Sequence, residues 1–144
     1  KFHSDEWMKE KLLLEPQKIT AGLIIETKNG TSPGQLIFAD PGETVAAALS
    51  RMSENGITQM PVIEDNRSVG SFRESRVLAK LLADGSLLEA KVSDIMEPSF
   101  PVVQVDSSIN EIKTKLLESP AVVIEDFKRI TGIITRSDVL DLSS

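Results

Sequence analysis

Thr135 and Asp138 stand three residues apart in the run Gly132–Asp138 (GIITRSD), which Val139 and Leu140 follow. An apolar strand is predicted to end here and a helix to begin. A hydroxyl and a carboxylate beside the free N–H groups of a helix start suit the binding of a sugar or a phosphate. The same spacing also defines a capping box, in which the two residues bond to each other's backbone N–H groups. The residues alone leave both interpretations open.

The composition of the 144-residue chain excludes several classes of function. It has no cysteine and one histidine, His3, so we expect no disulfide, no metal site and no histidine-based triad. A net charge of −6 argues against a nucleic-acid partner and an anionic membrane surface. No apolar run approaches the roughly 20 residues of a membrane span, and residues 1–15 are too charged for a signal peptide. We therefore expect a cytoplasmic protein.

A repeat sets the expected architecture, because residues 18–90 and 91–144 show the same order of elements: strand, helix, strand, strand, helix. The sequence Val-Ile-Glu-Asp is identical in the second strand of each half. The first strands are predicted at Leu36–Ala39 and Val102–Val105, and Ser108 with Glu111 is predicted to cap the helix that follows the second of them. A half of this size buries little core alone, so we expect an α+β fold in which two βαββα motifs pack through their sheets about a pseudo-two-fold axis.

This repeat, with Ile57–Ile63 and Gly132–Asp138, resembles the CBS-domain pair, or Bateman module. A narrower resemblance joins Phe2–Met8 and Gly56–Val62 to the carboxy-terminal regulatory region of bacterial cystathionine β-synthases. It implies that residues 1–17 form a linker helix after a catalytic domain, where pyridoxal phosphate (PLP) supports the lyase reaction. Nothing in the chain resembles the site of the lysine that holds this cofactor. The resemblance therefore implies a non-catalytic regulatory fragment, partnered by its own catalytic domain and by a second copy in a homodimer.

CBS pairs typically bind adenosyl compounds between their halves, and the resemblance implies a role for each residue that matches the motif. Asp138 would hold the ribose diol, and Thr135 the ribose or a phosphate oxygen. An anion would lie near Arg136 and Ser137 at the helix start. The adenine walls would be Ile57, Thr58, Gln59, Met60 and Pro61, and the floor would be Val103 and Gln104. Ile57 and Met60 are equally compatible with plain core positions, and Gln59 with a solvated one.

The first repeat departs from the pattern, because Arg73 and Arg76 stand where the second has Thr135 and Asp138. Arginine has no acceptor for a ribose hydroxyl, so we expect one working cleft. The two arginines are expected to form surface ion pairs, for example with Glu74, or to hold an anion. S-adenosylmethionine is favoured over AMP, ADP and ATP because the chain is acidic. The alternative is an assembly module that dimerises without binding a ligand; catalysis by this chain is not expected.

Overall fold

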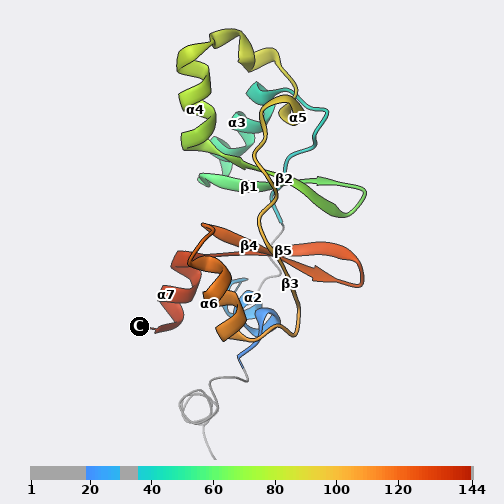
Figure 1. The fold of residues 1–144 in the computed structure, drawn as a ribbon, viewed down its shortest axis with the longest axis vertical. Helices are drawn as coiled ribbons and strands as arrows, with labels where there is room; N and C mark the ends of the chain where they lie inside the picture. Colours follow the sequence, from blue (N-terminus) through green and yellow to red (C-terminus); the bar gives the residue numbers. More distant parts are fainter. Residues whose placement is uncertain (1–18, 30–35, 144) are drawn as a thin grey trace, which may run out of the picture.

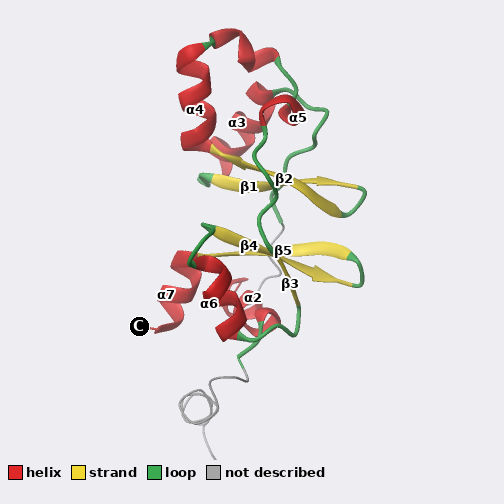
Figure 2. Cartoon of the chain, viewed as in Figure 1, coloured by secondary structure: helices red, strands yellow, loops and turns green. Residues whose placement is uncertain are grey.

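The computed structural model describes residues 19–29 and 36–143, so the predicted linker helix of residues 1–17 lies outside the described residues. Two halves are stacked, and their sheets face each other at the centre (Figure 1). Helices cover the outer face of each sheet (Figure 2). This arrangement confirms the α+β fold of two sheet-packed motifs that the repeat predicts.

The first half holds an antiparallel pair of strands, β1 (Gln59–Glu64) and β2 (Arg67–Arg73), between helices α3 (Val45–Asn55) and α4 (Glu74–Ala83). A short 3₁₀ helix, η2 (Gly85–Glu89), follows α4. Thr44 caps α3 by accepting from the N–H of Ala47, and Gly56 ends it in the left-handed region at φ 62°. Capping of this kind explains why the helix begins and ends where it does.

The second half holds a three-stranded sheet in the order β3 (Val102–Gln104), β4 (Ala121–Asp126) and β5 (Arg129–Thr135). Strand β3 is parallel to β4, and β4 is antiparallel to β5. Helix α6 (Ile109–Leu116) is capped by Ser108, whose hydroxyl accepts from the N–H of Glu111, and α7 (Arg136–Ser143) follows β5. The predicted cap at Ser108 is therefore confirmed.

The prediction of a strand at Leu36–Ala39 is wrong for most of its length. Only Ala39 joins the sheet, through a single parallel bridge to Val62. The chain turns directly afterwards, where the Asp40 carboxylate accepts from the N–H of Gly42 at 2.8 Å. An aspartate followed by proline and glycine favours such a turn over a longer ladder.

Each half completes the core of the other. Ile19 and the following helix α2 (Ala21–Asn29) pack into the second half, where Ile19 and Ile24 join its buried cluster. Helix α5 (Val92–Ile95) packs into the first half, where both of its terminal residues are buried. The two helices are attached in equivalent ways. Thr20, the residue before α2, forms a β-bridge with Ser108, the N-cap of α6. Lys91, the residue before α5, forms a β-bridge with Thr44, the N-cap of α3. Burial of a valine or isoleucine contributes about 1.5–3 kcal/mol, so this exchange stabilises both cores.

A third buried cluster lies where the sheets meet. Phe100, Ala121 and Val123 form it, with Ile130 and Ile133 packed alongside. At the hairpin end of the sheets, the N–H of Ile130 donates to the carbonyl of Asn66 at 3.1 Å. This bond joins the two halves directly. Within the described ranges, no helix is long and apolar enough to cross a membrane.

Candidate functional site

Thr135 and Asp138 form a reciprocal pair at the junction of β5 and α7. The Asp138 carboxylate accepts from the N–H of Thr135 at 2.8 Å, and the Thr135 hydroxyl accepts from the N–H of Asp138 at 3.4 Å. Both side chains are half-buried. The capping box that the spacing predicts is therefore present. A carboxylate has two oxygens, so a capping role and contact with a ligand hydroxyl are compatible.

Arg136 and Ser137, which lie between Thr135 and Asp138, are held in different ways. The Ser137 hydroxyl lies 3.3 Å from the Thr135 hydroxyl, which places three oxygen-bearing side chains at one corner. Arg136 instead donates from Nε to the carbonyl of Leu116 at 2.8 Å, at the end of α6. A cation beside the last carbonyls of a helix is favourable, and this contact directs the guanidinium to α6. With this guanidinium bonded to α6, the corner presents mainly the oxygen atoms of Thr135, Ser137 and Asp138.

The corresponding corner of the first half is cationic. Arg73 precedes α4 without a side-chain cap, whereas Thr135 caps at the equivalent place. The described ion pairs are Arg51–Glu43 and Lys80–Glu97, so the ion pairs predicted for Arg73 and Arg76 are not found among the described residues. The two corners therefore differ in charge although their backbones correspond.

The segment predicted to wall the adenine runs along the first-half corner. Gln59 pairs with Arg73, and the carbonyl of Thr58 accepts from the first N–H of α4, that of Glu74. Met60 and Pro61 are buried, and Ile57 packs against the first core. The side chains of Met60 and Ile57 thus contribute to the core, while Thr58 is exposed and Gln59 half-exposed.

This segment and the Thr135 corner lie at the same end of the stacked sheets. The hairpin turns mark the opposite end, where Asn66 and Ile130 are bonded. Strand β1 starts, and β5 finishes, at the end away from those turns (Figure 1). The two predicted walls therefore face the same edge of the inter-sheet region.

The two predicted floor residues lie apart from that edge. Val103 is 1% exposed and belongs to the core of the second half. The Gln104 side chain is exposed and donates to the carboxylate of Glu125 at 3.0 Å. Within the described part of the chain, no group of three histidine, aspartate or glutamate side chains could hold a metal ion.

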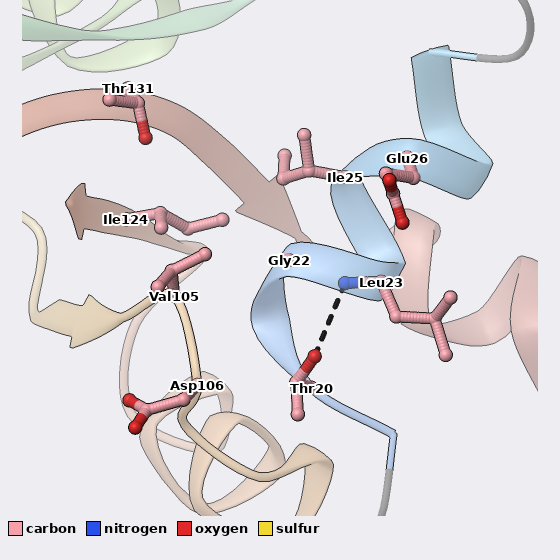
Figure 3. A pocket seen from close by; sticks show the side chains of 9 residues that line it. All are labelled: Thr20, Gly22, Leu23, Ile25, Glu26, Val105, Asp106, Ile124 and Thr131. Atoms are coloured by element: carbon pink, nitrogen blue, oxygen red, sulfur yellow. Dashed lines mark hydrogen bonds between the residues drawn. The ribbon is translucent and has the colours of Figure 1, made fainter.

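An open hollow of about 450 Å³ lies between α2 and the second sheet, and none of the predicted site residues is among those that line it (Figure 3). Its apolar wall comes from Ile25, Val105 and Ile124, and Thr20, Glu26 and Thr131 stand around it. The hollow is hard to predict from the sequence, because α2 precedes the first half in the sequence but packs against the second half. One local sign is Gly22, where a Cβ would lie 3.0 Å from a methyl of Val105.

Comparison with known proteins places these features in a family. The model of the CBS domain matches residues 32–83 and again residues 92–144. An uncharacterized protein of Methanopyrus kandleri is 25% identical over 113 residues, which are 74% of this chain and 57% of that protein. The chain thus spans less than two thirds of that relative's length.

Solved structures agree with the family match. A CBS domain-containing protein of unknown function from Bacillus anthracis has a TM-score of 0.73 at 22% identity, covering 88% of this chain and 94% of that one. The CBS-pair protein CBSX2 of Arabidopsis thaliana has a TM-score of 0.68 at 26% identity, covering 86% and 93%. The chain belongs to the CBS domain family and carries a CBS pair, a module that in general binds ligands and regulates rather than catalyses.

Proposed function

We propose that this CBS pair senses an adenosyl compound at the corner formed by Thr135 and Asp138. The observation that supports it is the cluster of three oxygen-bearing side chains there, held in place by the reciprocal cap. A ribose offers two hydroxyl donors, and a carboxylate accepts such donors strongly. Thr58 and Gln59, at the same end of the facing sheet, would contact the base.

The preferred ligand in this proposal is S-adenosylmethionine, followed by AMP, ADP and ATP. Nucleotide phosphates require cations, and the one arginine within the motif, Arg136, is bonded to α6. The chain also carries a net charge of −6. A ligand with a sulfonium and an ammonium group is favoured in such surroundings, whereas a triphosphate is disfavoured.

The regulated enzyme in this proposal is a PLP-dependent cystathionine β-synthase. The support is the resemblance of Phe2–Met8 and Gly56–Val62 to the regulatory region of that enzyme. Ligand binding would shift the equilibrium between two arrangements of the halves, and so act on the catalytic domain. Such control requires that the ligand bind the two arrangements with different affinities.

A second candidate function is assembly without a ligand. Leu78 and Leu82 on α4 are 46% and 90% exposed, and Leu140 on α7 is 67% exposed. Leu78 and Leu140 follow Gly70 and Gly132 at the same spacing, so the exposed leucines recur in both halves. Exposed apolar side chains on corresponding helices would suit a face-to-face homodimer.

Calorimetric titration of the protein with S-adenosylmethionine, AMP and ATP tests the proposal. The informative variant is Asp138→Ala, and the matched control is Ser108→Ala, which removes a side-chain cap from α6 in the same half. We expect binding of about one ligand per chain that Asp138→Ala abolishes and Ser108→Ala preserves. Absence of binding by all three compounds, with a dimer in light scattering, would favour assembly instead.

A further inference from the structure

Helix α6 is closed at its carboxyl end by a residue of the Thr135 and Asp138 corner. Nε of Arg136 donates to the carbonyl of Leu116, the last residue of the helix, at 2.8 Å. The amides that follow the helix bond to carbonyls earlier in it, so they leave this last carbonyl for the arginine. The final carbonyls of a helix have no partner within it, and a side chain from another element can supply one.

The first half ends its corresponding helix without help from its corner. Helix α3 ends at Gly56, whose N–H donates to the carbonyls of Met52 and Ser53. The residue equivalent to Arg136 is Glu74, the first residue of α4, and an ionised carboxylate has no proton to donate to a carbonyl. The link between corner and helix therefore belongs to the half that carries the Thr135 and Asp138 corner.

The amino end of α6 is tied to the segment that precedes α2. The N–H of Ile109, the first residue of α6, donates to the carbonyl of Ile19 at 2.9 Å, and the N–H of Ala21 donates to the carbonyl of Ser107 at 2.9 Å. Ile19 and Ile109 also belong to one buried cluster. Residues 1–18 precede Ile19 in the sequence, so a shift at this end of α6 reaches the residue through which they connect to the second half.

Helix α6 is too short to be stable alone. Its eight residues span about 12 Å, and isolated helices shorter than about 12 residues are marginal in water. Its stability therefore comes from the buried side chains of Ile109, Ile112 and Leu116 and from the bonds at its two ends. Loss of the bond at one end is expected to loosen the other end as well.

We propose that Arg136 is a positioning residue that couples the Thr135 and Asp138 corner to Ile19 through α6. In the closed state the guanidinium holds the carbonyl of Leu116, and in the open state the last turn of α6 is released. Arg136 lies within the single turn that joins Thr135 to Asp138, so a ligand that contacts these two residues acts on the same backbone. Such a ligand shifts the equilibrium by binding the corner of one state more tightly. The link exists without a ligand, and only its use in regulation rests on the proposed function.

Amide hydrogen exchange, followed by NMR on the full chain without a ligand, tests this link. The variant is Arg136→Met, which removes the donors but keeps an unbranched side chain of similar helix propensity. The matched control is Arg129→Met, which removes an exposed arginine from the other end of β5. In Arg136→Met we expect the amides of Ile109 and Ala21 to exchange about 5-fold faster, the factor that one net hydrogen bond supplies, and in the control less than about 2-fold faster.

Two results without a ligand would overturn the proposal. Faster exchange confined to the residues just after Leu116 would show a purely local contact. Faster exchange of the whole β4–β5 ladder by the same factor would show a general loss of stability instead of a link.

A second measurement uses the unmodified protein with S-adenosylmethionine, AMP and ATP. A compound that binds at the corner should shift the amide resonances of Ile109 and Ala21, and binding that shifts only residues at the corner would overturn the coupling. If none of the three compounds binds, the proposed function fails, and the exchange comparison without a ligand still decides whether Arg136 links the corner to Ile19.

Discussion

Replacement of Asp138 by alanine tests the reciprocal cap of α7 independently of any ligand. The substitution removes the 2.8 Å bond from the N–H of Thr135, which is worth about 1 kcal/mol at a helix start. It also removes a negative charge near the positive end of the helix dipole, worth about 0.5 kcal/mol. The expected loss in the free energy of unfolding is therefore about 1.5 kcal/mol.

Thermal unfolding followed by circular dichroism measures this loss. For a chain of this size, 1 kcal/mol corresponds to about 2–4 °C, so Asp138→Ala should lower Tm by about 3–6 °C. Asp138→Asn keeps an acceptor oxygen and loses only the charge, so its Tm should fall by about 1–2 °C. The difference between the two variants isolates the hydrogen bond.

The reasoning would be refuted if Asp138→Ala unfolded within about 1 °C of the unmodified protein. It would also be refuted if the asparagine and alanine variants lost the same stability. Thr135→Val supplies a further control, because the hydroxyl bond it removes is long, at 3.4 Å. Its cost should be about 0.5 kcal/mol, below that of Asp138→Ala.

Three further predictions concern stability. Partial burial alone would raise the pKa of Glu43, but the bidentate Arg51 guanidinium and a backbone N–H lower it below its ordinary 4.5. This pair therefore stabilises the fold above about pH 4.5 and loses its effect as pH falls through the lowered pKa. Urea unfolding should show Arg51→Ala about 1 kcal/mol less stable at pH 7, with a gap that narrows as the pH is lowered through that pKa; a gap that does not change with pH would contradict this. Gly70→Ala should cost about 1–3 kcal/mol, because the new Cβ would overlap a methionine side chain and lie 3.1 Å from a backbone carbonyl. Gly132→Ala should lower the free energy of unfolding by less, because its new Cβ meets only the flexible end of the Ile25 side chain at 3.0 Å. Chemical denaturation that finds Gly132→Ala less stable than Gly70→Ala would contradict this. Phe127 is 91% exposed and has a φ of 51°, a backbone conformation that suits asparagine. Phe127→Asn should therefore raise Tm by about 1–3 °C in calorimetry, and a lower Tm would contradict this.

The sequence predicted the features that depend on short-range pattern. The caps at Ser108 and Thr135, the two strands that share Val-Ile-Glu and the stacking of two repeats all appear in the structure. These succeeded because apolar spacing and capping act within a few residues. The strand at Leu36–Ala39 failed because the turn after it competes with the ladder.

Contacts between segments that are distant in the sequence could not be predicted from these local patterns. The contact from Arg136 to Leu116 joins residues 20 apart, and nothing local marks it. Likewise, the hollow depends on α2 lying against the second sheet, which follows from the exchange of helices between halves. Sequence reasoning could identify the Thr135 and Asp138 corner, but not the directions of the side chains around it.

The exchange of α2 and α5 also determines how mechanical load passes through the molecule. A pull on the chain before Ile19 enters the core of the second half first, although that segment precedes the first half in sequence. A pull on the segment that contains α5 acts first on the core of the first half, where Val92 and Ile95 are buried. A movement imposed at the amino-terminal side is therefore transmitted first to the half that carries Thr135 and Asp138.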